Sequence, residues 1–220
     1  MFKIFHKKPT KSNFSFAGNR SHIRVESELA GINKEEADSA FKQCKKEFID
    51  ALLLSHGFSK YKTRAYVRIN PIGLLEYIDL QKEHYGSRTF CVNFSAMPLY
   101  WPHEVLVFTF GHRLGNYICG KDIWWDYASE QVARVSFQNV AEAMEQYVLP
   151  WFEEISTEEG YREKLSGYWN KRFAAEWLDA LENTSDKEAL ITQSIITHGL
   201  PKKIQRRSLD LTQPSIEFNL

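Results

Sequence analysis

Five polar side chains at alternating positions of two predicted strands are the residues of this sequence best suited to chemistry. They are Tyr77, Asp79, Gln81, Asn93 and Ser95. We call the surface that they share the polar face, and we expect Arg68 to join it from a preceding strand. A carboxylate, two amides and a phenol present directional hydrogen bonds to a ligand or to a partner's sheet edge, whereas the alternative is the solvated side of an antiparallel sheet. Since no nucleophile stands next to a base, we predict no catalytic residue.

A second candidate site is formed by His112 and Arg113, which stand between two glycines. A guanidinium binds an anion through two parallel hydrogen bonds, and neighbouring glycines let the backbone approach the same anion. The alternative is a turn in which the arginine pairs with an acid such as Asp122 or Asp126.

Two adjacent tryptophans, Trp124 and Trp125, are candidates for a protein-binding surface. If their segment is a strand, the two indoles point in opposite directions, so we expect one in the core and one partly exposed. The alternative is that both residues serve only to pack the fold. An exposed indole close to Tyr127 would instead suit a binding hot spot.

Metal and cofactor motifs are absent from the sequence. Histidines 84, 103 and 112 are scattered, and the three cysteines are widely spaced without a C-x-x-C pair. Neither a zinc site nor a disulfide framework is indicated, and a reducing compartment fits. The chain also lacks a phosphate loop, a dinucleotide fingerprint and a G-x-S-x-G elbow, so we predict no cofactor and no metal.

The polar residues are positioned by a predicted β-hairpin over residues 74–96. Alternate apolar residues form what we call the apolar face of this hairpin, namely Ile78, Leu80, Phe90, Val92, Phe94 and Ala96. Placing these residues on one side requires pairing of even-numbered with even-numbered positions, so Ile78 should lie beside Phe94 and Asp79 beside Asn93. The same parity predicts a connecting loop of three or five residues.

Other elements surround the hairpin. A helix is predicted from Asn33 to Gly57, with an apolar stripe of Ala37, Phe41, Cys44, Phe48, Ala51 and Leu52. Strands are predicted at 65–69 and 123–127, and residues 105–110 are predicted as a strand or a buried loop. A further helix is predicted at 136–155, and Pro150 should bend or restart it. Another helix is predicted to begin after a Ser156 cap, and one near 169–183. A last helix is predicted to begin after a Ser185 cap and to end at Gly199.

These patterns predict an α+β fold. We expect an antiparallel β-meander of 3–5 strands, covered by the N-terminal helix and a C-terminal helical segment. Residues 1–30 are interpreted as a basic, loosely structured arm, 31–200 as a single domain with C-terminal helices, and 201–220 as a tail.

Composition and charge limit the class of protein. With 220 residues and 43% hydrophobic content the chain has enough apolar surface for a full core. No segment approaches the roughly 20 apolar residues of a membrane helix, and the N-terminus lacks a signal-peptide core, so we expect a cytoplasmic protein. Residues 1–25 and 202–207 are basic, whereas 142–190 is acidic. Because an acidic region separates the two basic ends, we do not expect strong nucleic-acid binding.

The order and spacing of several short motifs resemble a bacterial family known as domain of unknown function 4304. The motifs are Leu80-Gln81-Lys82, Phe90-Cys91-Val92-Asn93-Phe94, His112-Arg113-Leu114-Gly115, Trp124-Trp125 and Leu149-Pro150-Trp151-Phe152. The resemblance covers roughly residues 38–160. It implies a single α+β domain and supplies no activity, cofactor or catalytic residue.

Three functional hypotheses follow. The leading one is a non-enzymatic protein-binding module of an immunity-like or regulatory kind, since catalytic motifs are absent and aromatic residues are abundant. The first alternative is a small-ligand-binding protein or enzyme that uses the polar face, and the second is a weak nucleic-acid binder through the basic termini. A concave pocket with perturbed pKa values would favour the ligand hypothesis, whereas a flat, open polar sheet would favour a protein partner.

Overall fold

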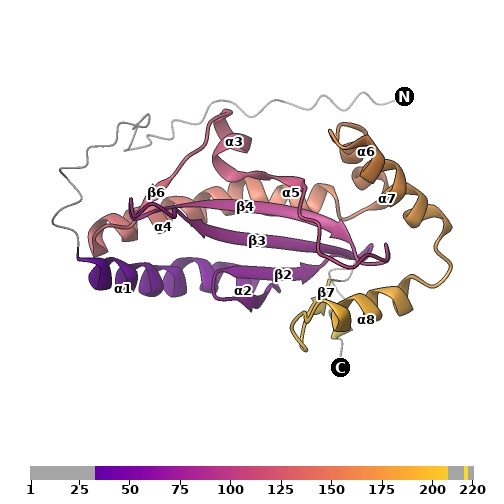
Figure 1. The fold of residues 1–220 in the computed structure, drawn as a ribbon, viewed down its shortest axis with the longest axis horizontal. Helices are drawn as coiled ribbons and strands as arrows, with labels where there is room; N and C mark the ends of the chain where they lie inside the picture. The colour runs from indigo at the N-terminus through magenta and orange to yellow at the C-terminus, as the bar shows by residue number, and fades with distance from the viewer. Residues whose placement is uncertain (1–32, 208–215, 218–220) are drawn as a thin grey trace. The chain divides into compact units, whose positions relative to one another are not determined.

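The computed structural model describes residues 33–207 and 216–217, and the arm predicted for residues 1–30 lies outside them. The helices are α1 (Lys34–Cys44), the π-helix η2 (Lys45–Asp50), α2 (Ala51–Ser55), α3 (Leu114–Cys119), α4 (Glu130–Ala143), the π-helix η3 (Met144–Val148), α5 (Leu149–Glu154), α6 (Glu158–Ser166), α7 (Lys171–Asn183) and α8 (Lys187–Thr197). The strands are β1 (Ser59–Lys62), β2 (Ala65–Ile69), β3 (Leu74–Lys82), β4 (Thr89–Pro98), β5 (Phe110–Arg113), β6 (Trp125–Asp126), β7 (Gln205–Arg206) and β8 (Ile216–Glu217). The predicted α+β fold is confirmed (Figure 1).

The centre of the sheet is the antiparallel meander β2-β3-β4-β5. The predicted register of the hairpin is confirmed, because Ile78 pairs with Phe94 and Asp79 with Asn93. In the described residues the sheet has 8 strands, since β1 and β7 pair with β2, β6 pairs with β4, and β8 pairs with β7.

The loop of the hairpin preserves the predicted parity. Residues 83–88 separate β3 from β4, one residue more than the longest loop expected. The backbone N–H of Glu83 still donates to the Thr89 carbonyl at 2.9 Å, which leaves five residues, 84–88, beyond this last bond. An odd number beyond the bond keeps both sets of apolar side chains on one side.

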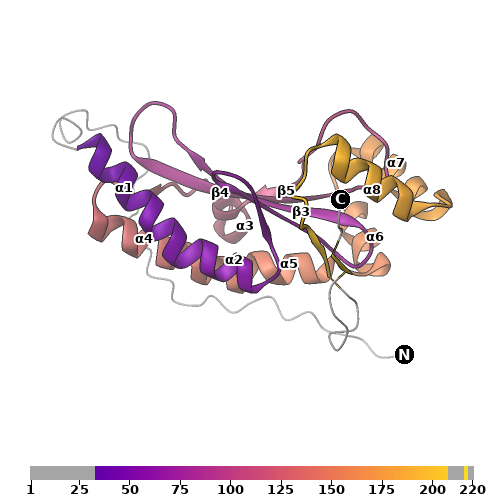
Figure 2. The same ribbon diagram turned by 90° about the horizontal axis from the view of Figure 1, so that it is seen from below.

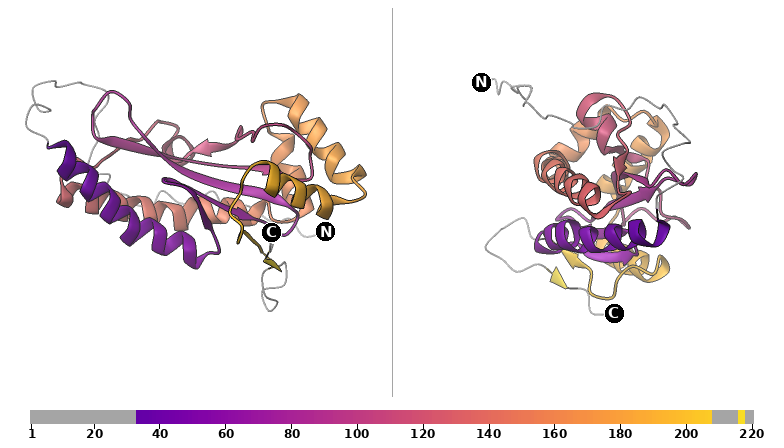
Figure 3. Two further views of the ribbon diagram at one scale, coloured as in Figure 1. Left: turned by 60° about the horizontal axis from the view of Figure 1, so that its bottom comes forward. Right: turned by 90° about the vertical axis from the view of Figure 1, so that its left-hand side faces the viewer.

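The apolar face of the hairpin packs on a layer of helices. Helices α1 and α4 run alongside each other over this face, and α5 continues from α4 (Figures 2 and 3). Aromatic rings fill the interface: Phe90 stacks on Phe137 at 4.6 Å between centroids, and Phe94 contacts Trp151 edge-on at 5.3 Å. The core therefore lies between the sheet and these helices.

Two π-helical segments change which residues face the core. The N-terminal helix follows the predicted stripe up to Cys44, but from η2 onward the fully buried apolar residues are Ile49 and Leu53, whereas the predicted Phe48 and Leu52 are half-buried and Ala51 is exposed. The predicted stripe is therefore displaced by one residue in the second half of this helix. A π-turn contains more residues than an α-turn and so rotates all later side chains around the axis. The second segment, η3, directly precedes the helix that carries Pro150, where the sequence predicts a restart.

The C-terminal helices lie at the end of the sheet where β3 begins and β4 ends (Figure 2). The Ser194 hydroxyl on α8 donates to the Leu99 carbonyl at 2.7 Å. Within residues 201–220, β7 adds a parallel strand beside β2 through the pairing of Ile69 with Arg206. No helix in the described residues has the length and apolar character needed to cross a membrane.

Three local predictions are wrong. Of residues 105–110, only Phe110 belongs to a strand, β5, and the rest form an irregular segment in which Val105 is 65% exposed. The turn considered as the alternative for His112 and Arg113 is wrong, because both residues belong to strand β5, which pairs with β4. The caps of the two later helices are Thr157 and Asp186, each one residue after the predicted serine.

Candidate functional site

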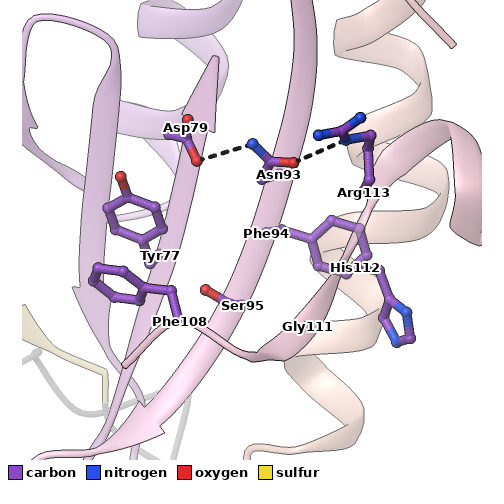
Figure 4. Close-up of a pocket in the computed structure, with 9 residues that line it drawn as sticks. All are labelled: Tyr77, Asp79, Asn93, Phe94, Ser95, Phe108, Gly111, His112 and Arg113. Carbon is purple, nitrogen blue, oxygen red and sulfur yellow. Dashed lines mark hydrogen bonds between the residues drawn. The ribbon is translucent and has the colours of Figure 1, made fainter. Parts of the chain in front are cut away.

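The polar face forms the floor of a concave pocket (Figure 4). Strand β3 contributes Tyr77 and Asp79, strand β4 contributes Asn93 and Ser95, and strand β5 closes one side. The pocket is lined by Tyr77, Asp79, Asn93, Phe94, Ser95, Phe108, Gly111, His112 and Arg113. Its volume of about 430 Å³ is in the range of small-molecule sites.

Hydrogen bonds join four polar side chains across the floor. The Asn93 amide group donates to Asp79 Oδ1 at 3.3 Å and to Gln81 Oε1 at 3.1 Å. Arg113 Nε donates to Asn93 Oδ1 at 3.4 Å. The strand register brings these groups together, because Asn93 pairs with Asp79 on one side and with Arg113 on the other. Four of the predicted candidates, Asp79, Gln81, Asn93 and Arg113, therefore meet on one surface.

Arg113 also forms an ion pair with Asp122, which is the arrangement considered from the sequence as the alternative to anion binding. Its Nη1 lies 2.6 Å from Asp122 Oδ2, and its guanidinium lies 5.3 Å from the centre of the Trp124 ring. The Arg113 side chain remains 28% exposed. Trp124 is half-buried and lies next to the floor of the pocket, in contact with Arg113.

Three other candidates lie on the opposite side of the sheet. Arg68 pairs with Glu76 and is buried, so the expectation that it joins the polar face is wrong. His112 pairs with Phe94, and its ring points away from the pocket toward Tyr117 (Figure 4). Trp125 is buried beside Phe90, which confirms that one of the two indoles belongs to the core.

Phe108 forms an aromatic wall that the sequence does not predict. Its ring stacks on Tyr77 with centroids 3.9 Å apart and planes 16° apart. The residue belongs to the irregular segment 101–109, part of which is predicted from its β-prone composition as a strand or a buried loop. Phe108 lies within this part, the run 105–110, and its stacking partner becomes visible only in the fold.

Gly111 is required by the close approach of β5 to β4. A Cβ atom built on it would lie 2.1 Å from the Phe94 carbonyl oxygen and 2.4 Å from Ser95 Cα. Both are backbone atoms of the pocket floor, so any side chain at this position must displace one strand from the other.

We expect Gly111→Ala to lower the free energy of unfolding by about 1–3 kcal/mol, the cost of overpacking at a rigid position. The control is Gly167→Ala, because a Cβ there meets its nearest atom at an ordinary 3.7 Å. Urea denaturation measures both variants. Equal stability of the two would show that β5 shifts away from β4 without cost.

Burial shifts the pKa values of the titratable side chains in and beside the pocket floor. It raises the pKa of Asp79, and the Asn93 amide together with the charges of Arg64 and Arg113 only partly opposes the rise. Burial likewise raises the pKa of Tyr77, and the nearby carboxylate of Asp79 adds to that effect. Cys91, beside Gln81, has a pKa raised to about 11 by burial, so its thiol stays protonated and unreactive at neutral pH.

Asp79→Asn should stabilise the protein at neutral pH. A carboxyl whose pKa is higher in the folded than in the unfolded chain favours folding when protonated, and this contribution is lost as the pH rises through the folded pKa. Asparagine does not ionise. The variant's advantage in urea denaturation should thus be present at pH 7 and absent below the ordinary aspartate pKa of about 3.9.

Asp179→Asn on α7 serves as the matched control for this prediction, because Asp179 is exposed. Its stability should follow that of the unchanged chain at both pH values. A loss of stability in Asp79→Asn at pH 7 would contradict the raised pKa.

The part of the chain that the structure describes has no cluster of metal ligands, and two arginines of its C-terminal basic cluster are paired with acids. No group of three His, Cys, Asp or Glu side chains there is arranged to hold a metal ion. In the C-terminal basic cluster, Arg206 pairs with Glu188 and Arg207 with Glu153. Both arginines are therefore engaged by acidic groups of the helices.

One family comparison gives a match. Residues 49–154 match the model of a family described as Domain of unknown function (DUF4304). Neither the curated proteins nor the solved structures include a match to the chain. The matched segment contains the meander β2-β3-β4-β5 and every residue that lines the pocket. The resemblance to this family that the sequence motifs indicate is therefore confirmed over residues 49–154.

Proposed function

We propose that this protein binds a small polar ligand in the pocket of the polar face. The observation that carries the proposal is the hydrogen-bonded chain Asp79–Asn93–Arg113 across the floor of a concave site. Convergent polar groups inside a partly apolar cavity, one of them with a shifted pKa, are typical of ligand sites.

The arrangement favours binding over catalysis. Ser95 lines the pocket, but the imidazole of His112 points to the other face of the sheet and cannot serve as its base (Figure 4). The buried thiol of Cys91 is held in its protonated form. A nucleophile needs a base within hydrogen-bonding distance or a lowered pKa, and neither the hydroxyl nor the thiol has one.

A thermal-shift screen of small polar metabolites tests the proposal. A ligand present at 100 times its Kd stabilises the folded state by about 2.7 kcal/mol, which raises the melting temperature of a chain of this size by roughly 5–10 °C. The shift should persist in the control Asp179→Asn and should be strongly reduced in Asp79→Asn and Arg113→Ala.

Two results would overturn the proposal. One is a screen in which no compound raises the melting temperature. The other is a shift of equal size in the native chain, Asp79→Asn and Arg113→Ala, since the ligand would then bind away from the floor.

The protein-binding module predicted from the sequence is the second candidate function. The observation that favours it is Trp169, between α6 and α7, which is 72% exposed and contacts Tyr168 edge-on. Exposed tryptophans are frequent anchors of protein interfaces. If Trp169 is such an anchor, affinity capture from the native host should recover a partner that Trp169→Ala loses and Asp79→Asn retains.

A further inference from the structure

The charges around the pocket balance one another. Asp79 lies in the field of Arg64 and Arg113, and Arg113 is paired with Asp122. Two carboxylates thus face two guanidinium groups. A ligand with a net charge would leave one of these groups uncompensated in a partly buried site, which costs binding free energy. An uncharged ligand fits this balance best.

The hydrogen bonds of the floor are long. The contact from Asn93 to Asp79 measures 3.3 Å and the contact from Arg113 to Asn93 measures 3.4 Å. Common N–H···O distances are about 2.7–3.2 Å, so both bonds can be exchanged for shorter ones to a ligand. The floor then offers an acceptor in Asp79 beside donors in Asn93 and Arg113. Its complement is a molecule that carries a hydrogen-bond donor next to an acceptor.

One face of the Tyr77 ring is covered by Phe108, a half-buried residue of an irregular segment. Phe108 stacks on it from the segment 101–109, and among the described residues no backbone-to-backbone hydrogen bond involves this segment. The segment is attached through side chains, with Val107 N–H donating to Met97 Sδ at 3.3 Å and Thr109 bonding to the Tyr168 hydroxyl. Segments with few backbone hydrogen bonds open at low free-energy cost. A flat ligand ring can therefore take the place of Phe108.

We propose that the ligand is an uncharged planar heterocycle with adjacent donor and acceptor groups, of the kind found in nucleobases. Its ring stacks on Tyr77 in exchange for Phe108, its N–H donates to the Asp79 carboxylate, and its carbonyl accepts from Asn93 or Arg113. This inference rests on the proposed function and specifies the ligand class of the same pocket.

Isothermal titration calorimetry with uracil, cytosine and hypoxanthine tests the inference, with 1,3-dimethyluracil as the matched compound without N–H donors. At least one of the three heterocycles should bind, and dimethyluracil should bind about 10-fold more weakly than uracil or not at all. Asp79→Asn should weaken binding about 10- to 100-fold, the loss expected for a hydrogen bond to a charged group. Circular dichroism verifies that each variant is folded.

Phe108→Ala separates an exchangeable cover from a structural wall. If the ligand must displace Phe108, the variant should bind about 2- to 10-fold more tightly, since an aromatic pair no longer competes. Weaker binding in this variant would contradict the exchange, and equal binding of uracil and dimethyluracil would contradict the role of Asp79. If sugars such as glucose bind in an Asp79-dependent manner and the heterocycles do not, the ligand class is wrong while the proposed function holds. If nothing binds, both fail.

Discussion

Phe94→Ala should lower the free energy of unfolding by about 3–5 kcal/mol, as expected when a buried phenylalanine is truncated. The side chain is 1% exposed and lies at the centre of the apolar face. Its ring contacts Trp151 at 5.3 Å, Tyr117 at 5.5 Å and Phe152 at 6.2 Å between centroids. Truncation leaves a cavity between the sheet and α5 that rigid neighbouring rings cannot fill.

Urea denaturation measures this loss, with Val135→Ala as the control, because Val135 on α4 is 51% exposed. The control should change stability by no more than about 0.5 kcal/mol. A loss below about 1 kcal/mol for Phe94→Ala would contradict the packing of the hairpin on α5.

Glu76→Leu should be similarly destabilising, by about 3–5 kcal/mol, because it leaves a buried guanidinium without its partner. Arg68 Nε lies 2.6 Å from Glu76 Oε2, and the two side chains are 3% and 0% exposed. Arg68 also donates to the His56 carbonyl at 2.6 Å and lies over the Phe58 ring at 4.4 Å, so it cannot reach solvent without opening this region.

The double variant Arg68→Met/Glu76→Leu should recover most of this loss. Replacing both members of a buried ion pair with apolar residues of similar volume is often neutral or stabilising. Equilibrium denaturation of both single variants and the double variant completes the cycle. A double variant less stable than Glu76→Leu would show that Arg68 stabilises the fold through His56 and Phe58 instead of through Glu76.

The central hairpin was predictable because its chemistry is local and periodic. Alternation of apolar and polar residues fixes which side chains share a face, and this alone places Asp79 beside Asn93. Arg113 was recognised as a site residue from its type. Its position next to Asn93 depends on strand β5. This strand is short and does not show the alternation of apolar and polar residues that marks the hairpin.

The errors arise where tertiary structure overrides a local pattern. The π-helix η2 shifts the buried stripe by one residue, and neither composition nor spacing indicates the extra residue in the turn. The expectation that Arg68 joins the polar face is wrong because its register opposite Glu76 provides a buried partner on the other face. Phe108 lies in an irregular segment, where no periodicity relates it to Tyr77.

The side-chain amide of Asn93 is the most direct reporter of the proposed ligand site. It bonds to Asp79 and Gln81 through nitrogen and accepts from Arg113 through oxygen, so a ligand on the floor must change its surroundings. Nuclear magnetic resonance spectra of the ¹⁵N-labelled chain, titrated with the compound that most raises the melting temperature, follow this amide together with Arg113 Nε–H. We predict saturable shifts of both signals, while the exposed amide of Asn183 stays unchanged. Saturable shifts elsewhere with unchanged Asn93 and Arg113 signals would contradict binding at the polar face.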